Sequence, residues 1–421
     1  MPYGQWWRRH RRAFWQHFRP DAVLGYQQAQ CQIARRFLRA LLQDPSELVE
    51  HIQYTALGSL MKVIYDIDVV RETDFRTYSS VLHSVQQGVG EVFQPGSSLI
   101  EYFPVLRWLP SFLPGGSYVR RASKWRSSAY HLREEPFVRA QKTFQSVSSV
   151  AFLHRLLKRV AASASESAAL VSEETEIAEN VAAVSLSGTL PFTYSLLQAF
   201  FLAMSQHPDV VKKAQEELDS VVGNNRLPDF GDQDKLVYLT AIVKETLRWH
   251  VVVPFGVPHC TTRDDELRGY YVPANTVLLP NIWCVACLHD PEAYQDPEDF
   301  RPERFIRDGK LDPSVRDPSA FAFGFGRRRV VCPGRHFAEA ALFINIASVL
   351  HVFDIGPPLD GAGKPIKIQY KMTNGFLSYA STSESYVGMA NSPRYDRYPE
   401  DCRCSIVPRS AQAERSIREA Q

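Results

Sequence analysis

Residues 323–334 read Phe-Gly-Phe-Gly-Arg-Arg-Arg-Val-Val-Cys-Pro-Gly, and an apolar helix pattern follows directly. This Gly- and Arg-rich turn places Cys332 at the start of that helix. Backbone N–H groups at a helix start and nearby guanidinium groups favour a charged sulfur. We therefore expect a lowered pKa for the Cys332 thiol and a thiolate ready to bind a metal. The alternative interpretation is a small cysteine buried at a helix start, which is common for free cysteines.

Helical patterns dominate the rest of the chain. Residues 2–42 predict basic helices broken at Pro20, with apolar residues at helical spacing from 33 to 42. Helical patterns also occur from 177 to 204, from 208 to 221 and around Glu245, and residues 337–353 are apolar nearly all round. Pro191 interrupts one of these patterns, because an interior proline removes a backbone hydrogen bond. Residues 270–272 and 276–279 are typical of strands in hairpins. The sequence predicts a mainly α fold with small β-sheets, forming one domain over residues 1–421.

Two stretches do not fit this pattern. Residues 163–176 are small, polar or acidic, and we expect a flexible surface loop there. Residues 380–398 are rich in Ser and Tyr and are interpreted as an insertion.

Composition excludes several classes of protein. With 421 residues, 45% of them apolar, the chain can bury a large core, and its net charge of +2 argues against steering toward nucleic acid. Seven scattered cysteines indicate a reducing compartment. The sequence contains no His-Glu-x-x-His or Gly-x-Ser-x-Gly motif and no run of eighteen apolar residues. Protease, hydrolase and integral membrane classes therefore lack their usual signals.

Three further motifs accompany the Cys332 loop. Trp7 lies four residues before Arg11, Glu245 lies three residues before Arg248, and residues 300–305 read Phe-Arg-Pro-Glu-Arg-Phe. In this order the four motifs resemble those of the cytochrome P-450 monooxygenases. The sequence around residues 281–283 and 300–305 is most similar to fungal members of secondary metabolism, such as the O-methylsterigmatocystin oxidoreductase-like group. The resemblance implies the helical fold of that family.

The resemblance also implies a cofactor and a reaction. Iron protoporphyrin IX (haem b) would be bound through Cys332, with Trp7, Arg11, His259 and an arginine of the 327–329 run, taken as Arg328, at its propionates. For His259 the alternative is an ordinary loop histidine. Electrons would come from NADPH through a separate flavoprotein reductase. One oxygen atom of O2 would enter a lipophilic small molecule.

The Glu245 helix is expected to carry a structural clamp. Glu245 and Arg248 lie one helical turn apart, and in the resembling family the residue matching Arg304 joins them. Leaving a buried carboxylate or guanidinium without its partner costs about 3 to 5 kcal/mol. We predict that these three residues hold the structure beneath the haem loop and take no part in the chemistry.

The chain departs from the family pattern at the distal helix. Family members carry an acid followed by an alcohol there, and this chain has Pro191 and Phe192 in their places, neither of which relays a proton. Thr193 or Thr189 with ordered water could substitute. We expect weakly coupled oxygenation, or a haem-thiolate isomerase or peroxygenase that needs no O2 activation. A third alternative is a haem-free scaffold that kept the clamp but lost catalysis.

Other features concern partners and location. The arginines at 327–329 and Arg335 form either a solvated turn or a docking face for an acidic redox partner. Residues 88–116 contain four prolines and cannot form one helix; they either touch a membrane or a substrate entrance, as the resemblance implies, or pack on the core. Family members of full length lie at the endoplasmic reticulum membrane. We interpret this chain as N-terminally truncated, since Trp7 matches a helix well inside the family fold.

Overall fold

The computed structural model describes residues 3–69, 72–93, 99–110, 117–144, 151–162, 167–283, 287–324, 331–366, 368 and 401–420. Within them the helices are α1 Gln5–Phe18, α2 Pro20–Val23, α3 Gln27–Gln43, α4 Leu48–Tyr65, α5 Glu72–Phe93, α6 Leu99–Tyr102, α7 Ser117–Phe144, α8 Phe152–Ala162, α9 Ala168–Gln206, α10 Pro208–Val221, α11 Val237–Trp249, α12 Ser319–Ala322, α13 Arg335–Val352 and α14 Ala411–Glu419. The strands are β1 His259–Cys260, β2 Asp265–Leu267, β3 Tyr270–Val272, β4 Val277–Leu278, β5 Ile306–Arg307, β6 Lys310–Leu311, β7 Phe353–Gly356 and β8 Ser405–Pro408. The mainly α fold with small sheets is confirmed.

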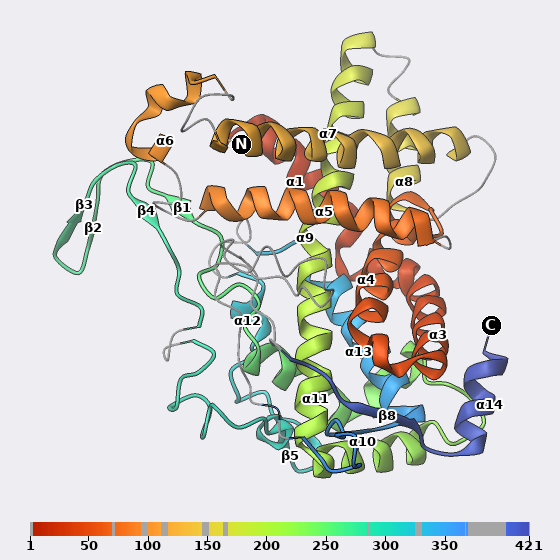
Figure 1. The fold of residues 1–421 in the computed structure, drawn as a ribbon. Coiled ribbons are helices and arrows are strands. Elements are labelled where there is room, and N and C mark those ends of the chain that lie inside the picture. Colours follow the sequence, from red (N-terminus) through yellow and green to blue (C-terminus); the bar gives the residue numbers. More distant parts are fainter. Residues whose placement is uncertain are drawn as a thin grey trace.

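Helix α9 organises the molecule, and Figure 1 shows it running through the middle of the fold. Its first half packs with α1, α4, α5, α7 and α8 in one buried apolar cluster. Its second half packs with α3, α10, α11 and α13 in another. Between the two halves, residues 187–192 are partly buried, except Gly188, which is exposed. This short stretch is where the helix can face a cavity instead of a core.

The start of α9 corrects the expected flexible loop at 163–176. Residues 163–166 lie outside the described residues, and helix α9 already begins at Ala168. The Ser167 side chain accepts a hydrogen bond from the Leu170 N–H at 3.1 Å and caps the helix. Glu174 then pairs with Arg159 of α8 at 2.5 Å. The polar and acidic residues from 167 to 176 therefore cap helix α9 and form ion pairs on its surface. The helix predicted at 177–204 is confirmed as part of α9, which contains Pro191 in its interior.

The predicted strands are present, but their partners were not predicted. Strand β3 pairs with β2, and β4 pairs with β1, all antiparallel. Arg268 and Gly269 have φ of 53° and 84°, which suits the two-residue turn between β2 and β3 because its twist matches that of paired strands. The predicted helices at 208–221 and after Cys332 are confirmed as α10 and α13. The expected insertion at 380–398 lies outside the described residues.

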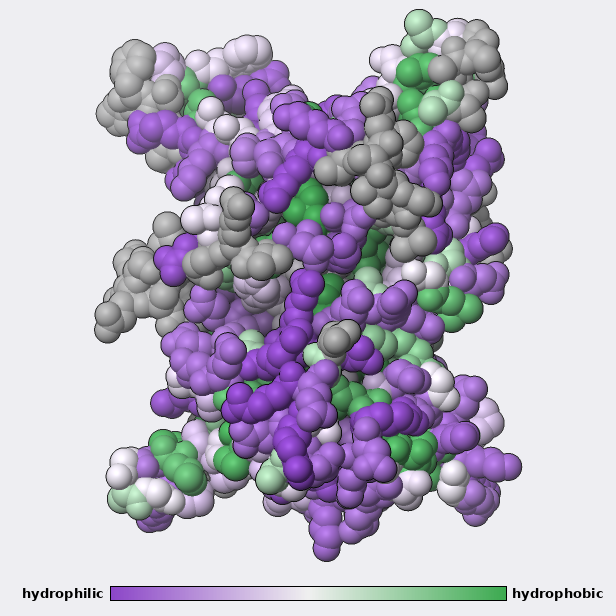
Figure 2. Space-filling view, turned by 90° about the vertical axis from the view of Figure 1, so that its right-hand side faces the viewer, coloured by the Kyte–Doolittle hydropathy of each residue, from purple (hydrophilic) through white to green (hydrophobic). Residues whose placement is uncertain are grey.

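The visible outer face is mostly polar. Figure 2 shows a largely hydrophilic surface on the side of α3, α8 and α14, with small separate apolar patches. No helix in the described part of the chain is long and apolar enough to cross a membrane.

Candidate functional site

A cavity of about 1350 Å³ lies beside the partly buried middle of α9. Its wall brings together residues that are far apart in the chain. Of the predicted site residues, Trp7, Arg11, Thr189, His259 and Cys332 all line it. The lining is mainly apolar, and Val253 and Val257 contribute from the segment that was expected to face the pocket. Residues 375–377, expected there too, lie outside the described residues.

Cys332 is held at the cavity wall by its neighbours. Its N–H donates to the Phe323 carbonyl at 2.7 Å, which joins the two described ends of the Gly- and Arg-rich turn. The Arg11 guanidinium donates to the Val331 carbonyl. The Cys332 side chain is exposed, and it lines the cavity. The alternative of a small cysteine buried at a helix start is therefore wrong.

The pKa of the Cys332 thiol differs from the expectation. Although Cys332 is open to the cavity, the protein groups around its sulfur reduce its hydration and so raise this pKa; the Gly334 N–H and the charges of Arg11 and Arg335 oppose the shift without reversing it. The expected lowering is thus wrong for the thiol by itself, because lost hydration outweighs the nearby donors and cations. Burial also lowers the pKa of Arg11, and the sulfur acts in the opposite direction.

The two candidate threonines of α9 have different surroundings. Thr189 lines the cavity, whereas Thr193 is buried in the helix packing and is not part of the wall. A Cβ built on Gly334 would lie 3.7 Å from Thr189 Oγ1 and 3.9 Å from Cys332 Sγ, so glycine keeps the space between hydroxyl and thiol free of a side chain. Phe192 lines the same wall and packs on the Phe323 ring with centroids 4.7 Å apart.

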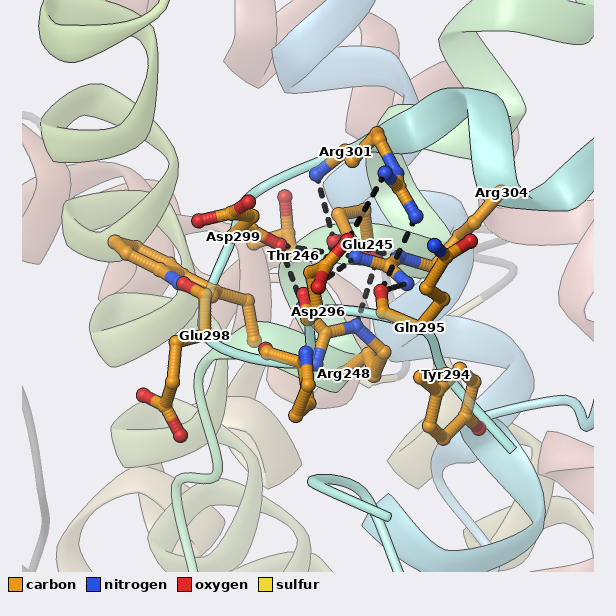
Figure 3. A network of polar contacts seen from close by, with 12 residues as sticks. Glu245, Thr246, Arg248, Tyr294, Gln295, Asp296, Glu298, Asp299, Arg301 and Arg304 are labelled. Carbon is orange, nitrogen blue, oxygen red and sulfur yellow. Dashed lines mark hydrogen bonds and ion pairs between the residues drawn. The ribbon is translucent and has the colours of Figure 1, made fainter. Parts of the chain in front are cut away.

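The predicted contacts of the clamp are present (Figure 3). Glu245 accepts two hydrogen bonds from Arg248, at 2.7 and 2.8 Å, and one from Arg304 Nε at 3.1 Å. A fourth comes from the Arg301 backbone N–H at 2.8 Å. Arg248 also donates to three carbonyl groups of the segment 288–299. Because the Glu245 and Arg248 side chains are fully buried, this network fixes the 288–304 segment against α11.

Sequence reasoning missed part of the wall. His10, Asn180 and Arg133 also line the cavity, from α1, α9 and α7. Asn180 could have been predicted from the sequence, because it lies eight residues before Gly188 and helical spacing places both residues on one face of α9. Arg328 lies outside the described residues, so its predicted role stays a prediction.

Comparisons with known proteins agree with this arrangement. The family model described as Cytochrome P450 matches residues 1–378. Cytochrome P450 monooxygenase COX2 of Coprinopsis cinerea is 38% identical over 380 residues, covering 88% of this chain and 69% of the relative. Tryptamine 4-monooxygenase of Psilocybe cyanescens is 34% identical over 420 residues, covering 99% of this chain and 77% of the relative. Cytochrome P450 monooxygenase ple1 of Rhodocybe pseudopiperita is 33% identical, with coverage of 99% and 74%.

The chain belongs to the cytochrome P450 family, and it is an oxidoreductase of the monooxygenase type. This family uses haem, and its members typically receive NADPH-derived electrons through a reductase. The residues of the cavity fit that group. Cys332 can offer the one axial thiolate that such a haem takes from the protein, and the cationic Arg11 lines the same wall. The volume exceeds the roughly 300–1,000 Å³ of an ordinary ligand pocket, which leaves room for a cofactor and a substrate.

Proposed function

We propose that this chain is a haem-thiolate monooxygenase that oxidises a lipophilic small molecule in fungal secondary metabolism. The supporting observation is that Cys332, Arg11, Trp7 and His259 converge on one mainly apolar cavity. An apolar wall with few polar groups selects a lipophilic substrate by shape. The fungal relatives support the setting in secondary metabolism, and the O-methylsterigmatocystin oxidoreductase-like group remains the predicted subgroup.

Each wall residue has a proposed role toward the cofactor. Cys332 would supply the axial thiolate, and bound haem would supply the activation of oxygen. Arg11 and Trp7 on α1 and His259 on β1 would bind the propionates, together with Arg328 from the sequence pattern. Arg11 is suited to this role because it already anchors the loop through the Val331 carbonyl.

The first experiment measures haem content and the ferrous carbonyl spectrum of the purified protein. We expect stoichiometric haem and a thiolate-type spectrum in the wild type, and loss of that spectrum in Cys332→Ser. The matched control is Cys260→Ser, which changes an exposed cysteine of strand β1 and should leave the spectrum intact. If the Cys332→Ser protein retained the thiolate-type spectrum, Cys332 would not be the axial ligand. Absence of haem from the wild type would favour the haem-free scaffold.

A second candidate function follows from the distal helix. Phe192 occupies the cavity wall where family members carry an alcohol, and Pro191 stands at the acid position. We propose that Thr189 is the hydroxyl that supplies protons here, because it lines the cavity and Thr193 does not. If Thr189 supplies them poorly, the same site suits an isomerase or a peroxygenase. The test compares the product formed per NADPH consumed with the product formed when hydrogen peroxide replaces NADPH and O2. A high yield per NADPH indicates a monooxygenase, and a high yield only with hydrogen peroxide indicates a peroxygenase.

A membrane contact is proposed for residues 99–108. Helix α6, the next residue and the following 3-10 turn, η3 Pro104–Trp108, hold large apolar side chains that are between 59% and 73% exposed: Leu99, Tyr102, Phe103, Val105 and Trp108. This exposure favours a surface role over packing on the core. We propose that these side chains touch a lipid surface, consistent with endoplasmic reticulum membranes for the family. Flotation with phosphatidylcholine vesicles tests this, and Trp108→Ser with Val105→Ser should weaken binding.

The redox partner is proposed to dock near the start of α13. Arg335 lies there, next in the chain to the Cys332-Pro333-Gly334 turn. A reductase with an acidic surface would complement this charge together with the 327–329 run. Charge reversal at Arg335 should slow reduction by the reductase, more so at low salt.

A further inference from the structure

The cavity extends well beyond Cys332 along one face of α9. Asn180, Val184, Ser187 and Gly188 all line it, at the i, i+4, i+7 and i+8 spacing of a single helix face. With a rise of 1.5 Å per residue, Asn180 lies about 12 Å along the helix from Gly188. The wall therefore has a far end whose chemistry can differ from that of the end near the sulfur.

The hydrogen bonds of His10 fix the orientation of the Asn180 amide. His10 Nδ1 lies 2.9 Å from the Trp6 carbonyl oxygen, which can only accept, so Nδ1 carries the hydrogen. An amide nitrogen can only donate, so Nε2 is the acceptor where the Asn180 Nδ2 group faces it. Asn180 Nδ2 lies 3.2 Å from Nε2 and must be the donor of that bond.

This orientation leaves Asn180 Oδ1 as an acceptor with no hydrogen-bond partner among the residues that the structure describes. The side chain is half-buried and lines the cavity. We propose that Asn180 Oδ1 accepts a hydrogen bond from the substrate and so determines specificity for a lipophilic molecule that carries a hydroxyl or N–H group. This inference rests on the proposed function, since it names the substrate class of the same cavity.

The charges at the Asn180 end of the cavity favour a substrate whose donor group is neutral. Arg133 also lines the cavity, but its Nε and Nη2 both donate to Glu179 Oε2, at 3.0 and 2.6 Å. The cation is thus already paired with a carboxylate, and an acidic substrate would gain little from it. A donor bound at Asn180 would lie about 12 Å from the Gly188 level, so oxidation should occur on a carbon remote from the donor.

The test uses matched ligands on haem-loaded protein. One pair is 1-dodecanol and its methyl ether, and the other is carbazole and N-methylcarbazole; in each pair only the first member donates. Dissociation constants are measured by calorimetry. We expect the donor to bind about five- to tenfold tighter in the wild type, as one hydrogen bond allows. Asn180→Leu should bring this ratio close to one, and Asn180→Asp should keep it.

The matched control is Ser187→Ala, which removes a hydroxyl from the same helix face and should leave the ratio unchanged. His10→Phe removes the bond that orients the amide and should lower the ratio in part. The inference is overturned if, in both pairs, the donor binds the wild type less than twofold tighter than its methylated partner, or if neither member binds. So does an Asn180→Leu protein that retains the ratio, or that weakens both members equally, which would mark Asn180 as a structural residue only. The carbonyl spectrum of the same samples tests the proposed function separately.

Discussion

Replacing Glu245 by glutamine should strongly destabilise the fold, although the two side chains have nearly the same shape. Glu245 Oε1 accepts from Arg248 Nη2, Arg301 N and Arg304 Nε, and Oε2 accepts from Arg248 Nε at 2.7 Å. A glutamine oxygen in the first position keeps three of these bonds. Its amide nitrogen then faces the Arg248 Nε donor, and the carboxylate charge that balances a fully buried guanidinium is lost.

We expect Glu245→Gln to lower the free energy of unfolding by about 3 to 5 kcal/mol, the cost of breaking a buried ion pair by removing one partner. The measurement is urea denaturation followed by far-ultraviolet circular dichroism. The matched control is Glu414→Gln, because Glu414 pairs with Arg418 on α14 while both side chains are exposed to solvent. Such exposed pairs contribute about 0 to 1 kcal/mol, so the control should stay near the wild type. A loss below about 1 kcal/mol in Glu245→Gln would refute the clamp.

Three further outcomes are expected. Thr189→Val should reduce product formed per NADPH at least tenfold if Thr189 supplies protons, whereas Thr193→Val should change this ratio little; equal effects of the two variants would contradict the assignment. Gly88→Ala should lower the free energy of unfolding by about 1 to 3 kcal/mol, because the new Cβ would lie 2.7 Å from a tryptophan ring of α7. The control is Gly58→Ala in α4, where nothing lies within 4 Å of the new Cβ, and thermal unfolding should show this variant to be as stable as the wild type or more stable. Burial, with a lesser effect of a nearby aspartate, raises the pKa of Glu339 from 4.5 to about 7, so the stability of the wild type should fall as the pH rises through that window. Glu339→Gln should therefore be more stable than the wild type by about 1 kcal/mol at pH 8, a value reduced because the side chain is about a third exposed. A difference in unfolding free energy between the two proteins that is the same at pH 5 and pH 8 would count against this.

The sequence predicted the elements that depend on neighbours in the chain. The helix after Cys332, the Pro208 helix and the pairing of Glu245 with Arg248 follow from residues within a few turns of one another, where spacing alone decides which side chains meet. The error at 163–176 has the same origin. The partners of those acidic residues lie on other helices, Arg9 on α1 and Arg159 on α8, so the composition of 163–176 by itself resembled that of a loop.

Local spacing thus determined the thiol at the start of α13, the clamp on α11 and the helical class of the protein. Tertiary packing decided that α1, α9, β1 and the Cys332 turn surround one cavity, that Thr189 faces it while Thr193 does not, and that burial raises the pKa of the thiol. The physical reason is the range of the interactions. Helix periodicity and caps act over one or two turns, whereas a cavity and its electrostatics depend on which surfaces distant elements bring together.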